Sequence, residues 1–207
     1  MKNITGCLLI VLLQLVAVLS AYCQDHQMHM THQSANQPKN VYLLMMDTMM
    51  TQMAQAPKSK NPEDNFLNQM IPHHEGAVAM ARYEITHGKN FDMIQLAKSI
   101  LAEQQTELAT MRLWLKQPWA RNDSATAQYL KAQDGSMDVM MKNLPAKASL
   151  SDPDKSFALV MLPHHRAAME MAKAILSYGS APQVHSFARQ LIADEQIEIQ
   201  QMSSYTQ

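Results

Sequence analysis

The fold is decided by the stretch NPEDNFLNQMIPHHEGAVAMA, residues 61–81, because the chain contains this pattern twice. Residues 152–172 are DPDKSFALVMLPHHRAAMEMA, and the shared positions are displaced by 91 residues (161 minus 70, for the methionine before each His pair). The same displacement relates the flanks without a gap, from Met46-Asp47 and Met137-Asp138 as far as Met111 and Met202. Self-similarity of this length is typical of a tandem repeat, so we predict two copies of one structural unit.

Each copy is predicted to form three helices. Asn61 and Asp152 are suitable N-caps, and the proline that follows each is favoured at the first helical position. The second helix of each copy is therefore expected to begin at Pro62 and Pro153 and to end near a glycine, Gly88 or Gly179. The other helices are expected at about 41–55, 91–116, 123–144 and 182–205. The predicted fold class is all-α, a helical bundle from two tandem three-helix repeats.

The composition excludes some classes of function. The chain has 17 basic and 18 acidic residues, and this near neutrality argues against nucleic acid as a partner, since phosphate neutralisation needs a basic surface. Two counts are unusual in 207 residues: 19 methionines and only 5 glycines. Few glycines and few aromatic residues favour helices over short strands.

The first residues are typical of a secretory signal. Lys2 precedes an apolar run from Cys7 to Leu19, which is too short to span a membrane and is not followed by another such run. We expect a cleaved signal peptide and a periplasmic or secreted protein with no membrane span. A lipid anchor at Cys23 is disfavoured by the bulky Tyr22. The predicted parts are the signal at 1–23, a disordered tail at 24–40, the first repeat at 41–118 and the second at 119–207.

The cysteines restrict the kinds of metal ligand. Cys7 lies inside the predicted signal and Cys23 at its edge, so the mature domain has essentially no thiols. A disulfide or a thiolate metal site is therefore excluded from it. Any soft ligand must be a methionine thioether, which suits an oxidising compartment.

One face of the second helix of each copy carries candidate metal ligands. At about 100° per residue, His73 and His74 lie on either side of Met70, with the small Ala77 between them. Methionine at helical spacing is usually core packing. If only one histidine of each pair binds metal, the other is expected to be packed or hydrogen-bonded. The candidate ligands on these two helices are Met70, His73, His74, Met80, Met161, His164, His165 and Met171.

The third helix of each copy adds carboxylates. Glu103, Glu107 and Met111 follow one stripe at a spacing of four residues, and Asp194, Glu198 and Met202 match them. If this stripe faces the second helix, the interior brings His, Met and carboxylate together, as metal sites in helical bundles do. The candidate ligands here are Glu107, Met111, Glu198 and Met202. Ion pairs from the two glutamates to Arg82 or Lys173 are the alternative.

The predicted tail holds a third group of candidate ligands within a few residues: His26, Met28, His29, Met30 and His32. A disordered tail has no core to fill, so a packing role is excluded there. Thioether with imidazole and without thiolate favours Cu(I) or Ag(I), and imidazole also serves Cu(II). Zinc would prefer cysteine or carboxylate, and iron would need more carboxylate.

At these residues the chain resembles the bacterial family known as domain of unknown function 305. The shared pattern is a Phe, then Met-Ile-x-His-His-x-x-Ala-x-x-Met-Ala, then a helix with Gln, Glu, Met and Trp-Leu. The first copy has Phe66, residues 70–81, Gln105, Glu107, Met111 and Trp114-Leu115; the second has Phe157, residues 161–172, Gln196, Glu198 and Met202, without the Trp-Leu pair. The resemblance implies a ferritin-like bundle and an association with copper binding and copper tolerance.

These observations lead to a periplasmic copper-binding protein for sequestration, tolerance or transfer, with Cu(I) favoured and Ag(I) as a second cargo. Its partners would be metal ions and a copper exporter or chaperone. No catalytic motif is evident, so we do not expect an enzyme. The first alternative is a ferritin-like metal oxidase using iron or manganese, which is weakened because Met70 and Met161 occupy the glutamate position of Glu-x-x-His. A methionine-rich structural or redox-buffering protein is the other.

Overall fold

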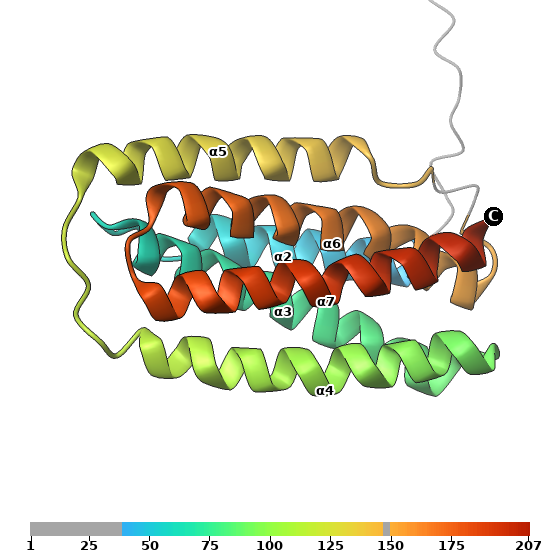
Figure 1. Cartoon of the computed structure of the whole chain (residues 1–207). Helices are drawn as coiled ribbons and strands as arrows, with labels where there is room; N and C mark the ends of the chain where they lie inside the picture. The colour runs from blue at the N-terminus through green and yellow to red at the C-terminus, as the bar shows by residue number, and fades with distance from the viewer. Residues whose placement is uncertain (1–38, 147–149) are drawn as a thin grey trace, which may run out of the picture. The chain divides into compact units, whose positions relative to one another are not determined.

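The computed structural model describes residues 39–146 and 150–207, and within them it contains six α-helices and no strand (Figure 1). The all-α prediction is confirmed, and the helices begin and end within a few residues of the expected positions. The predicted signal and tail lie outside the described residues, apart from the tail's last two. No described helix is long and apolar enough to cross a membrane. The helices are α2 (Val41–Gln55), α3 (Pro62–His87), α4 (Phe91–Trp114), α5 (Asp123–Lys142), α6 (Pro153–Tyr178) and α7 (Pro182–Thr206).

The ends of the two central helices are set by local side-chain chemistry. The Asn61 side chain accepts a hydrogen bond from the Asp64 N–H at 2.6 Å, and Asp152 accepts from the Lys155 N–H at 2.8 Å. Both are the predicted N-caps, and proline follows each as the first helical residue. α3 and α6 also continue through an interior proline each, directly before the His pair.

α3 and α6 form the centre of the bundle. α3 packs against α2 and α4 of its own repeat, α6 packs against α5 and α7 of its own, and α3 and α6 pack against each other. Residues 39–207 form one compact unit, so the two repeats share one bundle, a question that the sequence left open. The arrangement is ferritin-like, as predicted.

The two central helices run antiparallel and are joined by reciprocal contacts. Glu63, at the start of α3, accepts hydrogen bonds from the backbone N–H groups of Ser180-Ala181, just after α6, at 2.6 and 3.1 Å. Asp154, at the start of α6, accepts from the N–H groups of Lys89-Asn90, just after α3, both at 2.8 Å. Glu63 and Asp154 are repeat counterparts, so exchanging the repeats maps one contact onto the other. This pseudo-twofold relation brings the middle of α3 onto the middle of α6.

A buried carboxyl group lies at one end of this contact. The Tyr42 hydroxyl donates to Glu84 Oε2 at 2.6 Å, and the Asp154 carboxylate is close by. Burial raises the pKa of Glu84 to about 7, with the hydrogen bond from Tyr42 opposing the shift and Asp154 adding to it. Glu84 is therefore protonated in the folded protein over a pH range in which it is ionised in the unfolded chain.

We expect Glu84→Gln to change how stability depends on pH. Because the folded pKa is raised, protonated Glu84 stabilises the fold fully below its ordinary pKa, and this stabilisation is lost as the pH rises through about 7. Glutamine keeps an acceptor for Tyr42 and a donor toward Asp154 but does not titrate. Between about pH 5 and pH 8 the thermal midpoint of the wild type should fall relative to that of the variant. Parallel pH profiles in calorimetry would contradict this assignment.

Candidate metal centre

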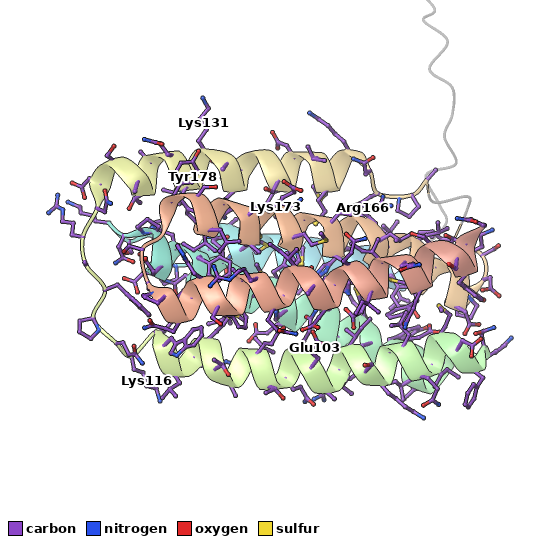
Figure 2. The ribbon with its side chains drawn as sticks, viewed as in Figure 1. Glu103, Lys116, Lys131, Arg166, Lys173 and Tyr178 are labelled. Atoms are coloured by element: carbon purple, nitrogen blue, oxygen red, sulfur yellow. The ribbon has the colours of Figure 1, made fainter. Side chains whose placement is uncertain are left out.

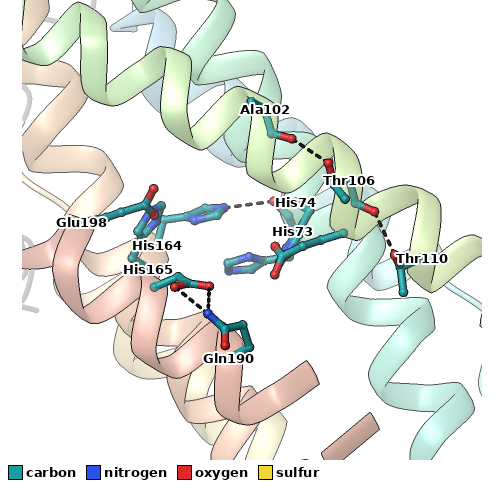
Figure 3. Close-up of polar contacts among 11 residues, drawn as sticks. His73, His74, Ala102, Thr106, Thr110, His164, His165, Gln190 and Glu198 are labelled. Carbon is teal, nitrogen blue, oxygen red and sulfur yellow. Dashed lines mark hydrogen bonds and ion pairs between the residues drawn. The ribbon is translucent and has the colours of Figure 1, made fainter. Parts of the chain in front are cut away.

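Four histidines form a row across the contact between α3 and α6, and all four are fully buried (Figure 3). The ring centroids of His74 and His73 lie 6.3 Å apart, those of His73 and His164 3.8 Å, and those of His164 and His165 5.7 Å. His73 and His164 are repeat counterparts, so the pseudo-twofold relation pairs them with each other. The sequence predicted buried His pairs, but it did not predict that the two pairs would join.

The inner pair has few hydrogen bonds. His164 Nε2 donates to the backbone oxygen of His73 at 3.1 Å. Both ring nitrogens of His73, and Nδ1 of His164, have no partner in the described part of the chain. Burial, together with the neighbouring histidines, lowers the pKa of His73 well below its ordinary value and lowers that of His164 likewise. Both rings are therefore neutral and keep a lone pair available to a metal ion.

The outer pair is held by carboxylates. His74 Nε2 lies 2.8 Å from Glu107 Oε2, and His165 Nε2 lies 2.8 Å from Glu198 Oε2. A carboxylate accepts, so Nε2 carries the hydrogen, and in a neutral ring the lone pair is then on Nδ1. Neither of these two Nδ1 atoms has a partner among the described residues. A carboxylate that orients a histidine is the arrangement found behind metal-binding imidazoles.

This pairing decides between the two interpretations of the glutamates. Glu107 and Glu198 face the histidines, as expected if the third helix of each repeat turns its acidic stripe inward. The alternative, ion pairs to Arg82 or Lys173, is wrong: Lys173 pairs with Glu170 on the surface instead, and no ion pair of Arg82 occurs in the described part of the chain.

The predicted methionine ligands share the interior with this row. The six that belong to the helices are fully buried, so the donors available in the core are thioether sulfur and imidazole nitrogen: Met70, Met80, Met111, Met161, Met171 and Met202. Within residues 39–146 and 150–207, no three His, Cys, Asp or Glu side chains are arranged to hold a metal ion together. A metal ion in this core would therefore need thioether ligands or a movement of the side chains. The tail candidates, His26, Met28, His29, Met30 and His32, lie outside the described residues.

One buried carboxylate near the row was missed by the sequence reasoning. Glu195 is 2% exposed, and neither of its carboxylate oxygens has a partner among the described residues. Burial, followed by repulsion from the nearby acidic residues, raises its pKa well above the ordinary value. Burial and the same repulsion raise the pKa of Glu103 to about 8. The available signal was the position of Glu195 three residues before Glu198, which places both on one side of α7.

Comparison with known proteins gives a family and a fold. The sequence model of the family described as Domain of unknown function (DUF305) matches residues 13–115 and again residues 109–206. No curated protein matches the chain. The fold is similar to that of CopM in the Ag-bound form, with 22% identity over 71% of this chain and 96% of CopM, at a TM-score of 0.53. The Cu(I)-bound form of CopM is 24% identical over 69% of this chain and 94% of CopM, at a TM-score of 0.51. A DUF305 fragment from Deinococcus radiodurans is 21% identical over 72% of this chain and 98% of the fragment, at a TM-score of 0.51.

We expect His73→Leu to leave the metal-free protein as stable as the wild type or to stabilise it. The substitution removes two buried ring nitrogens that have no partner, and each such unmade hydrogen bond costs about 1–3 kcal/mol. His74→Leu is the matched control, because it breaks the bond to Glu107 and should lower the free energy of unfolding by about 1–3 kcal/mol. Denaturant unfolding of both variants without metal measures the difference. An equal loss in the two variants would assign His73 a structural role.

Proposed function

This chain belongs to the DUF305 family, in two tandem copies, and on that premise we propose that it is an exported protein that binds copper, chiefly Cu(I), in the core of its bundle. The observation that carries the proposal is the row of four buried imidazoles. Its ring nitrogens without a partner among the described residues are His73 Nδ1 and Nε2 and the Nδ1 atoms of His74, His164 and His165. Buried polar atoms are rarely left unpaired, so their retention favours a ligand that is bound in use.

The donor set favours Cu(I) among the biological metals. Thioether and imidazole are soft or borderline ligands, and the described residues include no thiolate that would favour zinc. Cu(I) has a filled d shell and accepts low coordination numbers, so two imidazoles completed by a thioether suffice. With nitrogen bound at about 2 Å, two imidazoles on one ion have centroids up to about 6 Å apart. The spacings within the two adjacent pairs, 5.7 and 6.3 Å, are close to that limit.

Met70 and Met161 are the first candidates for the thioether ligand. Each lies three residues before the inner histidine of its repeat and four residues before the outer one, so it is one helical turn from both rings. Met80 and Met171 lie about two turns after the inner histidines on nearly the same stripe. Because every one of these methionines is fully buried, each repeat supplies its own thioethers to the interior.

The similarity to CopM supports the same choice of ion. CopM has been solved in Ag-bound, Cu(I)-bound and Cu(II)-bound forms. Ag(I) and Cu(I) share a preference for thioether and imidazole ligands, which are the donors in the present core. At the identities observed the comparison concerns the fold, so the ligand argument rests on this chain's own residues.

Burial of the row favours sequestration as the role. An ion bound there is shielded from water and from competing ligands, and its entry requires the side chains around the row to move. We propose that the His/Met-rich tail captures copper first and that an exporter or a chaperone is the source or recipient. Storage of this kind provides copper tolerance.

The test is a Cu(I) titration of the purified protein against a chromophoric competitor, under anaerobic conditions. The wild type is compared with His73→Leu/His164→Leu and with a tail variant in which His26, Met28, His29, Met30 and His32 are alanine. We expect the core variant to bind Cu(I) at least about ten-fold more weakly, a difference of about 1.4 kcal/mol, while the tail variant keeps the tight site.

Each of the other outcomes favours a different copper site or a different function. Tight binding that survives in the core variant and is lost in the tail variant would place the copper site in the tail. If the wild type does not compete for Cu(I), copper binding is rejected. Tight iron or manganese binding with oxygen consumption would then support the oxidase, and methionine sulfoxide formation without metal affinity would support the redox buffer.

A further inference from the structure

A second group of ligands lies on the seam between α4 and α7. The two helices have few direct contacts with each other, and Glu103 and Glu107 of α4 act electrostatically on Glu195 of α7. Figure 2 places Glu103 on the side of α4 that faces α7. The side chains on the seam are repeat counterparts in three pairs, Glu103 with Asp194, Gln104 with Glu195, and Glu107 with Glu198. Five of the six are therefore carboxylates, and none of the lysine or arginine ion pairs in the described residues involves them.

Glu195 is the feature of the seam that points to a ligand. It is 2% exposed, and neither carboxylate oxygen has a partner within residues 39–146 and 150–207, although Glu103, Glu107 and Glu198 all act on it electrostatically. Its counterpart Gln104 is equally buried, and its amide oxygen also lacks a partner in the part of the chain that the structure describes. A buried carboxylate among other carboxylates is costly unless a proton or a cation compensates its charge.

The other carboxylates differ in how many of their oxygens already accept hydrogen bonds. Both oxygens of Asp194 accept hydrogen bonds from the Gln190 side chain, at 2.9 and 2.8 Å. Glu107 and Glu198 each use only Oε2, toward their histidines. No hydrogen bond or ion pair of the Glu103 side chain occurs in the described part of the chain. Four glutamates therefore keep free oxygens on the seam: Glu103, Glu107, Glu195 and Glu198.

A groove opens at one end of the seam. It has a volume of about 910 Å³ and is lined by the start of α4 and the end of α7. Ser99 in its wall lies one helical turn before Glu103, and Ile197 is adjacent to Glu198. Leu96 and Tyr205 line this end of the seam. Their repeat counterparts at the opposite end, Phe187 and Trp114, pack together with centroids 5.6 Å apart. One end of the seam is thus open and the other is filled by aromatic rings.

We propose that this seam is a second metal site, which binds an oxygen-preferring divalent cation through Glu103, Glu107, Glu195 and Glu198. Carboxylate oxygens suit Mn²⁺, Mg²⁺ and Ca²⁺, whereas the thioethers and imidazoles of the core suit Cu(I). The cation compensates the buried negative charge and enters through the groove. The carboxylates do not yet surround one point, so the cation draws these flexible side chains together as it binds. The site adjoins the copper row, because Glu107 and Glu198 also hold the outer histidines, but it does not depend on copper binding there.

The experiment uses Mn²⁺ as the probe and the purified protein without copper. Free Mn²⁺ has a sharp EPR spectrum in water that is lost on binding, so a titration gives the affinity. The test variant is Glu195→Gln, which gives the second repeat the residue that the first already carries as Gln104, so the fold should tolerate it. The controls are Glu170→Gln, a surface carboxylate paired with Lys173, and His73→Leu/His164→Leu, which alters only the copper row.

We expect the wild type and both controls to bind Mn²⁺, and Glu195→Gln to bind at least about ten-fold more weakly. Mn²⁺ should raise the thermal midpoint of the wild type and leave that of Glu195→Gln nearly unchanged. A wild type that binds Mn²⁺ but does not compete for Cu(I) would reject the copper proposal alone. Absence of Mn²⁺ binding by the wild type, or equal affinity in Glu195→Gln, would overturn the seam site and leave the carboxylates neutralised by protons.

Discussion

His73 and His164 lie with their ring centroids 3.8 Å apart where α3 meets α6, and this buried contact constrains the rest of the bundle. Three of the four ring nitrogens in this pair are buried with no hydrogen-bond partner among the described residues, which opposes folding, so other contacts must hold the central helices together. The apolar core around them and the reciprocal hydrogen bonds made by Glu63 and Asp154 provide that compensation. Because these carboxylates bind loops of the opposite repeat, they also fix how far α3 slides along α6, and hence that the two histidines meet.

The tandem repeat explains why the inner and outer histidines differ. In a pseudo-twofold arrangement a residue on the axis meets its own counterpart, as His73 meets His164. A residue off the axis meets a different side chain, and the same pairing then occurs twice, as in His74 with Glu107 and His165 with Glu198. One duplicated His-His motif thus yields a central pair with few hydrogen bonds and two outer rings oriented by carboxylates. The proposed copper site depends on this combination.

At some positions of α4 and α7 the two repeats have different residues, and these differences make the two ends of the seam unlike. Leu96 stands where the second repeat has Phe187, which leaves a groove at one end of the α4–α7 seam and an aromatic contact at the other. Gln104 stands where the second repeat has Glu195, so of these two equally buried counterparts only the one on α7 is a carboxyl group. Both differences concern α4 and α7, whereas the central helices keep the His pairs and the prolines before them. The outer helices have diverged around a conserved internal contact between the repeats.

The sequence by itself determined the two repeats, the helix bounds and the inward face with its histidines and methionines. These follow from local physics: N-caps and prolines start helices at fixed residues, and the helical period decides which residues share a face. Only the tertiary structure decided that His73 meets His164 and that His74 turns to Glu107. Adjacent residues on a helix diverge by about 100°, so they point to different neighbours, and which neighbours these are depends on how the helices pack. The burial of Glu195 has the same origin, because it requires α4 to face α7 across the seam.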